Sequence, residues 1–402
     1  MADNNQKILK EAKQQLGQIH VLDCRHEEII TAHHRLGTDA RDQIHKILAQ
    51  RLNQSGGVEN AQQQIRRARK LHLALSARQN NPKLSQTVRS AVAQYMACLQ
   101  SWAEGASLDG FAHSFIADAV DELPVSAMDL AVFLQEDEVG CQTGVLREQD
   151  GAAILWHTEE DYEDMPGQRF DKLRLFRFKT PQNKDICGFI YPDLLPGPTF
   201  GWHEGDYAQA VDSLHTRQVD DDNAILPNVF AWISLYLGKE MPHGTLAAEL
   251  GPFAGGYSVT SVRQNGATTQ VEKVDFANRA ANICTLQETP AKYLFQTNIV
   301  NPTSPAVLTE EHTTAEGRAR NSTRIRRTTR LLKVIKNSNT ALRHIFRMIR
   351  SRMGNEWAYS NPDVKGYFIC KMGMDSTHCW VGAGPALPND EPLHFVVGSK
   401  TV

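Results

Sequence analysis

The chain has 402 residues, of which 41% are hydrophobic and 22% are charged, and its formal net charge is -3 at pH 7. This length is sufficient for one large domain or two ordinary ones with a real hydrophobic core. The slightly negative charge disfavours a protein that binds nucleic acid over its whole surface. No window approaches the roughly 18 consecutive apolar residues of a membrane span, and residues 1–6 lack the apolar segment of a secretory signal.

Cysteine and histidine usage indicates a protein of a reducing compartment without a metal centre. The seven cysteines are odd in number and scattered, with no CxxC pair, which is typical of cytoplasmic proteins. Cys24, His26, His33 and His34 are near one another in the sequence but do not complete a zinc-type spacing. We therefore expect exposed helix histidines there, no metal site and no cofactor.

The first 120 residues or so predict helices. Apolar residues recur at helical spacing in three stretches, residues 8–19, 44–52 and 88–99. Turn signals at residues 55–57 and 80–82 separate them. We expect residues 1–140 to form a helical packing region or a propiece, ending in an exposed acidic loop at residues 136–138.

From residue 169 onward, period-two segments dominate and predict strands. The expected strands lie at residues 173–178, 186–191, 257–262, 268–274, 367–371, 378–381 and 394–397, with helices at 228–237 and 246–250. Asn265 and Gly266 mark the turn of one hairpin. The chain is therefore expected to combine a helical first part with a later part rich in strands, in agreement with the α+β class.

A short hairpin joins a cysteine to an acidic cluster. Residues 141–146 read as a strand, residues 147–151 as a turn containing an Asp-Gly pair, and residues 152–157 as the returning strand. That strand delivers Glu159, Glu160 and Asp161. Two antiparallel strands of this length can bring these carboxylates within reach of Cys141.

Cys141 has two interpretations. A catalytic thiol reacts as its thiolate and needs a base and oxyanion donors. If Cys141 were the first residue of a mature chain, its own amine, with an ordinary pKa of about 7.7 to 8.0, would serve as the base. The alternative is a buried structural cysteine that acts as a small hydrophobic side chain.

Five motifs in register give the hairpin a family context. Gly140 and Cys141, followed by the hairpin and residues 157–160, are similar to the Gly-Cys and "HNED" elements of the isopenicillin N acyltransferase-like family of N-terminal nucleophile hydrolases. Four more elements follow in the same order. Residues 194–202 resemble that family's strand and loop before the "GxNxxG" turn, and residues 296–298 resemble its "TNH" strand. Residues 321–327 resemble its "SxxRxxR" helix start, and residues 380–385 resemble its closing "WVAxGxP" strand. The resemblance covers roughly residues 130–402.

The resemblance implies an αββα sandwich and a self-cleaving enzyme. Cys141 would cut the Gly140 to Cys141 bond through an N-to-S acyl shift, and would then act as nucleophile and, through its freed amine, as base. Residues 1–140 would stay bound as a separate chain, and residues 141–402 would form the catalytic domain. The reaction would be amide hydrolysis or acyl transfer through a thioester, on a small acyl or amide substrate, with an anionic substrate as one option.

The same resemblance assigns supporting residues. Asn298 would supply an oxyanion donor; from the sequence alone, capping of the following turn is an equal alternative. Glu160, with Asp161 as its neighbour, would orient the amine. Arg324 would supply positive charge near the nucleophile. His203 and Arg327 would contact the substrate. A turn histidine such as His203 is, however, more often simply solvated.

Two alternatives remain open. The sequence departs from the family pattern at Gln142, Thr158, Glu160 and Ile299, which motivates a non-catalytic or unprocessed binding member of the same fold. Residues 318–352 are strongly basic, with no acidic residue between positions 316 and 356, and predict two amphipathic helices. A solvated helix face is the default reading, and binding of an anionic ligand or nucleic acid is the weaker alternative. A homo-oligomer is possible, and no membrane partner is expected.

Overall fold

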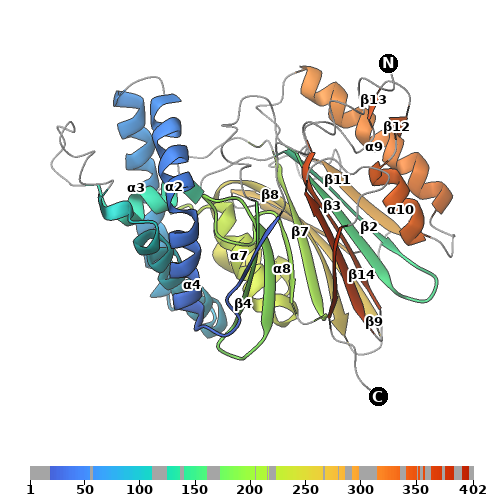
Figure 1. The fold of residues 1–402 in the computed structure, drawn as a ribbon, viewed down its shortest axis with the longest axis horizontal. Coiled ribbons are helices and arrows are strands. Elements are labelled where there is room, and N and C mark those ends of the chain that lie inside the picture. Colours follow the sequence, from blue (N-terminus) through green and yellow to red (C-terminus); the bar gives the residue numbers. More distant parts are fainter. Residues whose placement is uncertain are drawn as a thin grey trace.

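The chain folds into four layers, helices, sheet, sheet and helices (Figure 1). The protein therefore belongs to the α+β class, as predicted. The computed structural model describes residues 19–54, 58–110, 125–135, 140–160, 173–203, 205–214, 216, 223–265, 268–278, 280–285, 292–297, 315–335, 341–350, 352–353, 356–357, 364–373, 376–383 and 392–397.

The larger sheet has eight strands in the order β1-β4-β5-β6-β7-β8-β9-β10. Neighbouring strands are antiparallel except for the parallel pair β1 and β4. The strand bounds are β1 His20–Asp23, β4 Arg174–Lys179, β5 Asp185–Ile190, β6 Phe200–His203, β7 Tyr207–Leu214, β8 Phe253–Asn265, β9 Thr268–Asn278 and β10 Ala280–Thr285.

The smaller sheet has six strands in the order β11-β2-β3-β14-β15-β16, all antiparallel to their neighbours. The strand bounds are β2 Gly140–Arg147, β3 Ala153–Glu160, β11 Tyr293–Thr297, β14 Val364–Met372, β15 Thr377–Ala383 and β16 Leu393–Val397. A separate two-stranded ribbon pairs β12 Arg352–Met353 with β13 Glu356–Trp357.

Helices cover the outer face of each sheet. The bounds are α2 Ile29–Gln54, α3 Val58–Gln79, α4 Gln86–Gly105, α6 Ala127–Gln135, α7 Pro227–Leu237, η2 Gly238–Glu240, α8 His243–Leu250, α9 Ala315–Ile335 and α10 Ala341–Arg350. In Figure 1, α2, α3 and α4 lie on one side of the sheet pair, and α9 and α10 lie on the other.

Strand alternation divides the apolar side chains into three cores. One lies between the eight-stranded sheet and helices α2 to α8, one between the two sheets, and one between the six-stranded sheet and helices α9 and α10. In β3, for example, Leu155 packs between the sheets and Trp156 packs toward α9 and α10. Gly144 leaves room for the Trp156 ring, because a Cβ at position 144 would overlap it.

The region that precedes residue 140 is part of this common core rather than a separate unit. Helices α2, α3, α4 and α6 contribute to the same apolar cluster as α7 and α8. The structure also corrects the all-helical prediction, because β1 is a strand that joins the large sheet with His20 paired to Arg174. Most of the predicted first helix, residues 8–19, lies outside the described residues.

His33 was predicted to be an exposed helix histidine, and this prediction is wrong. Its side chain is fully buried, and its ring contacts the rings of Phe176, Phe178 and Trp232. Burial lowers the pKa of His33 to about 4. One ring nitrogen, Nδ1, bonds the carbonyl oxygen of Ile29 at 2.7 Å, so this histidine belongs to the helix-to-sheet core.

The other predicted elements in the described residues are confirmed. The Cys141 hairpin is β2 and β3, the Asn265 hairpin is β8 and β9, and the basic segment forms α9 and α10. None of the seven cysteines, all of which are described, forms a disulfide. Within the described residues, we find no helix that combines the length and the apolar character needed to cross a membrane.

Candidate active site

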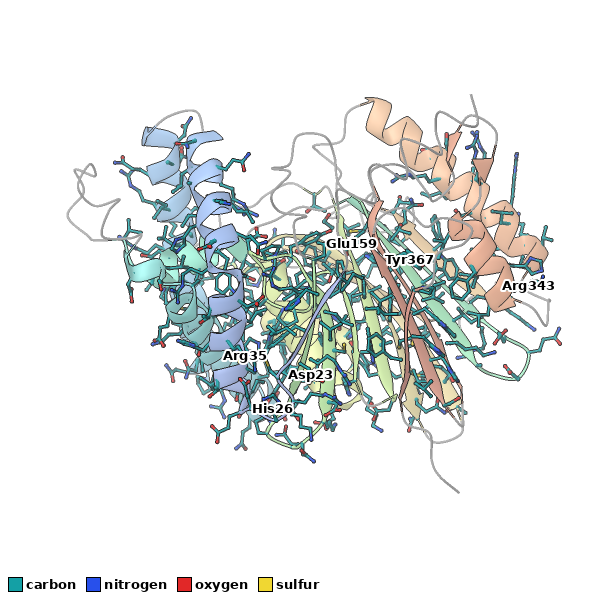
Figure 2. The ribbon with its side chains drawn as sticks, viewed as in Figure 1. Asp23, His26, Arg35, Glu159, Arg343 and Tyr367 are labelled. Carbon is teal, nitrogen blue, oxygen red and sulfur yellow. The ribbon has the colours of Figure 1, made fainter. Side chains whose placement is uncertain are left out.

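The β2-β3 register places four polar side chains between the two sheets. Cys141 pairs with Glu159, and Thr143 pairs with His157. Alternate residues of a strand face the same side, and Val145 and Leu155 of these strands pack in the core between the sheets. The four polar side chains therefore share that face, and Glu159 lies toward the upper end of the strands in Figure 2.

A continuous hydrogen-bond network links these side chains. The Cys141 thiol donates to Glu159 Oε2 at 3.6 Å, and the Tyr191 hydroxyl donates to the same oxygen at 2.8 Å. Glu159 Oε1 lies 2.7 Å from His157 Nε2, and His157 Nδ1 lies 2.7 Å from Thr143 Oγ1. If Nε2 carries the imidazole proton, Glu159 accepts three hydrogen bonds and Thr143 donates to Nδ1.

The network is closed to solvent. Cys141 is 2% exposed, and Thr143, His157, Glu159 and Tyr191 are between 0% and 1% exposed. A buried carboxylate is costly unless donors replace its water, and three donors converge on Glu159. The carboxylate is thereby fixed in position to take the proton of the Cys141 thiol.

Asp212 adds a second buried carboxylate from the opposite sheet. It lies on β7, whose alternate residues Ala208 and Ala210 pack between the sheets. Burial, with a smaller contribution from the nearby Glu159 charge, raises the pKa of Asp212 to about 7, although His157, Thr143 and Lys273 oppose the shift. A strongly shifted pKa near an imidazole and a second carboxylate is a physical mark of a functional site.

Lys273 supplies buried positive charge to this end of the sandwich. It lies on β9, with its Nζ 2.9 Å from Asp275 Oδ2, and both side chains are nearly inaccessible. Neither Asp212 nor Lys273 was predicted from the sequence. A signal was present for Asp212, which lies in its strand between the apolar Val211 and the small Ser213. Lys273 follows the charged Glu272 and lacks such a signal.

The structure brings Glu159, rather than the predicted Glu160, opposite Cys141. Glu160 pairs with Gly140 at the end of β3, and the side chains of these two residues lie outside the described part of the structure. Asp161 and Asn298 also lie outside it. The residue before Asn298, Thr297, pairs with Gln142, so β11 ends beside the start of β2.

Arg324 and Arg327 are both on α9, which packs over the outer face of the six-stranded sheet. Arg324 is buried, with 6% exposure, and Arg327 is half-buried. Other cations of this helix, including Arg326 and Arg330, are exposed. The basic segment thus combines an apolar face against the sheet with a solvated cationic face.

His203 does not join Cys141, nor is it solvated. It is 1% exposed, its ring stacks on Tyr207 at a centroid distance of 5.0 Å, and its Nδ1 lies 3.2 Å from Asp206 Oδ1. Its neighbour Trp202 packs between the sheets, whereas His203 contacts Tyr207, a residue of the helix-side core. His203 therefore faces the helix layer, away from Cys141.

Three of the network residues could hold a metal ion. One ligand atom each from Cys141, His157 and Glu159 lies within 4.8 Å of the other two. Sulfur, imidazole nitrogen and carboxylate oxygen form a ligand set that suits Zn²⁺. This set was not predictable from local spacing, because strand pairing brings the residues together.

No protein-family model matches the chain, and no curated protein matches it.

Proposed function

We propose that the protein is a self-processing cysteine enzyme of the N-terminal nucleophile type that hydrolyses an amide or transfers an acyl group through a thioester on Cys141. The observation that carries the proposal is the Cys141 thiol, held 3.6 Å from Glu159 Oε2 in a buried acid-base network. Two further features support it: the four-layer arrangement, and the position of Cys141 as second residue of β2, on the face that packs against the other sheet.

Self-cleavage needs a base before any free amine exists, and Glu159 fits this role. Glu159 takes the thiol proton while Cys141 Sγ attacks the carbonyl carbon of Gly140. The peptide C–N bond breaks, the Cys141 nitrogen takes that proton from Glu159, and Gly140 becomes a thioester on Sγ. Water then hydrolyses the thioester, which leaves a Gly140 carboxylate and a Cys141 with a free amine and thiol.

Turnover repeats the same chemistry on a substrate. The freed amine of Cys141 accepts the thiol proton, and Sγ attacks the carbonyl of a small amide or acyl donor. The leaving amine takes a proton, and water or an acceptor amine then breaks the thioester. Glu159 and His157 hold the charge of the protonated amine. Asn298 and Arg324 remain proposed as oxyanion donor and source of positive charge.

The first part of the chain stays in place after the cut. Helices α2 to α6 share an apolar core with α7 and α8, and β1 is hydrogen-bonded to β4. Burial of this extent holds two chains together without a covalent link. We therefore propose residues 1–140 as a bound partner chain.

Intact mass tests the proposal. The parent and a Cys284→Ala control, which removes a half-buried thiol on β10, should both give two fragments that break between Gly140 and Cys141. Cys141→Ala should give one uncut mass. Cleavage and activity that persist in Cys141→Ala would refute the proposal, as would an uncut parent whose Cys141 does not react with a thiol probe.

Metal binding is a second candidate, favoured by the clustering of the Cys141, His157 and Glu159 ligand atoms. It excludes the first, because a metal-bound thiolate is not free to attack. Elemental analysis of the purified protein separates the two. One equivalent of zinc on an uncut chain, lost in Glu159→Gln, supports the metal site, while a cleaved chain without zinc supports the enzyme.

A further inference from the structure

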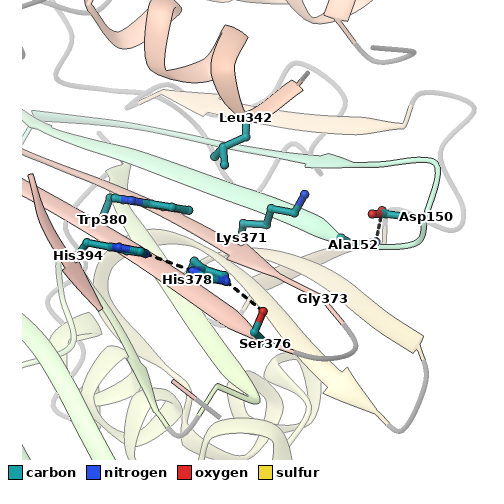
Figure 3. A pocket seen from close by; sticks show the side chains of 9 residues that line it. All are labelled: Asp150, Ala152, Leu342, Lys371, Gly373, Ser376, His378, Trp380 and His394. Atoms are coloured by element: carbon teal, nitrogen blue, oxygen red, sulfur yellow. Dashed lines mark hydrogen bonds between the residues drawn. The ribbon is translucent and has the colours of Figure 1, made fainter. Parts of the chain in front are cut away.

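A cavity of about 670 Å³ lies on the outer face of the six-stranded sheet. Its floor is formed by strands β14, β15 and β16, and Leu342 of α10 lies on its other side (Figure 3). The register places Lys371 opposite His378 and Trp380 opposite His394. This volume is in the range of small-molecule sites, so the cavity can admit a ligand.

Three side chains in the cavity form a hydrogen-bonded chain. Ser376 Oγ lies 3.0 Å from His378 Nε2, and His378 Nδ1 lies 3.1 Å from His394 Nε2 (Figure 3). A hydroxyl within reach of an imidazole that is itself oriented by a third group is the geometry of an activated nucleophile. The order here is serine, histidine, histidine.

Stacking holds the rings of His378, His394 and Trp380 in place. Trp380 lies parallel to His394, with centroids 4.8 Å apart and planes 3° apart, and His378 is stacked on both. Phe346 of α10 contacts the Trp380 ring edge-on at 5.5 Å. These contacts restrict ring rotation, and they also give the cavity a flat apolar wall.

The charges around His378 favour its neutral form. Burial lowers the pKa of His378, and the neighbouring His394 and Lys371 lower it further. Lys371 is paired with Glu148, and Asp150 lines the same cavity. A neutral imidazole near pH 7 is able to accept the serine proton.

We infer that this cavity is a second, serine-dependent esterase site, distinct from Cys141. Ser376 is the nucleophile, His378 the general base, and His394 a positioning residue that accepts the His378 Nδ1 proton in a hydrogen bond. The substrate class is a small carboxylic ester with a planar apolar group that lies against Trp380.

Ser376, His378 and water account for every proton that the reaction moves. Ser376 Oγ attacks the ester carbonyl and gives its proton to His378 Nε2. The alcohol leaves with that proton, and an acyl-serine remains. Water then loses a proton to His378 and attacks the acyl carbon, Ser376 regains its proton, and a carboxylic acid is released.

This site does not depend on the function proposed for Cys141. Ser376 immediately precedes β15, and His378 and Trp380 follow it at alternate positions on the side of α10. Cys379 and Val381 of the same strand pack between the sheets. The two sites therefore lie on opposite faces of one sheet. Failure of one leaves the other intact.

A fluorophosphonate probe tests the inference in full-length Cys141→Ala protein, so that the cysteine contributes nothing. We expect a covalent adduct that peptide mass spectrometry assigns to Ser376. Ser376→Ala should lose it, and Ser322→Ala, which changes an exposed serine on α9, should retain it. Labelling at other serines only, or no labelling, would overturn the inference.

Histidine variants separate catalysis from structure. His378→Gln should reduce labelling and hydrolysis of 4-nitrophenyl acetate on the order of 100-fold or more. His394→Gln should lower the rate less and shift its pH profile, because the residue acts through His378. Thermal melting checks that each variant folds. Equal labelling in parent and His378→Gln proteins of unchanged melting temperature would contradict the relay.

Discussion

The two faces of the six-stranded sheet carry two different groups of polar side chains. On the inner face, Cys141, His157 and Glu159 are at most 2% exposed, and the pairing of β2 with β3 brings them together. On the outer face, His378 is half-buried and His394 is exposed, beside an open cavity. The same alternation of side chains along a strand produces both.

The difference lies in what holds each set of groups. The inner network replaces water by hydrogen bonds within the protein, so each group has a fixed partner and small chemical changes have large effects. The outer groups are held by ring stacking and remain partly hydrated, so a ligand can displace water there. Removal of a single partner should therefore cost more on the inner face than on the outer one.

Glu159→Gln should have the largest effect. The substitution keeps the shape of the side chain and removes its ability to take the thiol proton, so self-cleavage should slow by about 10²- to 10⁴-fold. The rate is measured by intact mass against time after synthesis. Glu148→Gln is the matched control on the outer face, where the carboxylate pairs with Lys371. Unchanged cleavage in Glu159→Gln would show that Glu159 is not the base.

The stability of an Asp212→Asn variant tests the environment of the buried carboxylates between the two sheets. The pKa of Asp212 is raised from 3.8 to about 7 in the folded chain, so the folded state binds more protons than the unfolded state between these values. The stability of the parent therefore falls as pH rises from about 4 to 7, by up to about 4 kcal/mol. The variant lacks this loss and should be the more stable protein at pH 8.

Urea unfolding at pH 5 and pH 8 measures that difference. The advantage of Asp212→Asn should shrink toward pH 5, and Asp42→Asn, which alters an exposed residue of α2, should show no such trend. If the difference in unfolding free energy between Asp212→Asn and the parent does not change with pH, Asp212 does not titrate in this range.

Tyr191→Phe should have the smallest effect of the three. It removes one of the donors to Glu159 Oε2, and a hydrogen bond to a charged group contributes about 1.5 to 3 kcal/mol. We expect self-cleavage to slow by about tenfold and the chain to lose about 1.5 kcal/mol of stability. Tyr236→Phe, on a half-buried ring of α7, is the control. Equal rates and stabilities for the two variants would show that the Tyr191 hydroxyl does not support Glu159.

Much of the fold was predictable from the sequence, because local signals specify it. The Asp-Gly turn and the flanking apolar runs predicted the β2-β3 hairpin, and two apolar stripes predicted α9 and α10. β1 was missed, since a four-residue strand leaves too few positions for a period to appear. His33 was misjudged because its helix is covered on the histidine side by the sheet.

The candidate site was predictable only in part. Cys141 and a nearby carboxylate followed from the order of the motifs, but the identity of the carboxylate did not. A slip of one residue in pairing moves every side chain to the other face, so the register alone distinguishes Glu159 from Glu160. Asp212 comes from a strand of the other sheet and Tyr191 directly follows one, and no local pattern relates them to Cys141.

The sequence by itself determined the elements: the alternating and helical periods, the turn at Gly151 and the place of Cys141 at the start of a strand. Tertiary structure decided which side chains meet, because the packing of two sheets places Asp212 near His157, and strand register places Glu159 beside the thiol. The physical reason is that secondary structure depends on neighbours in the chain, whereas burial, desolvation and shifted pKa values depend on neighbours in space.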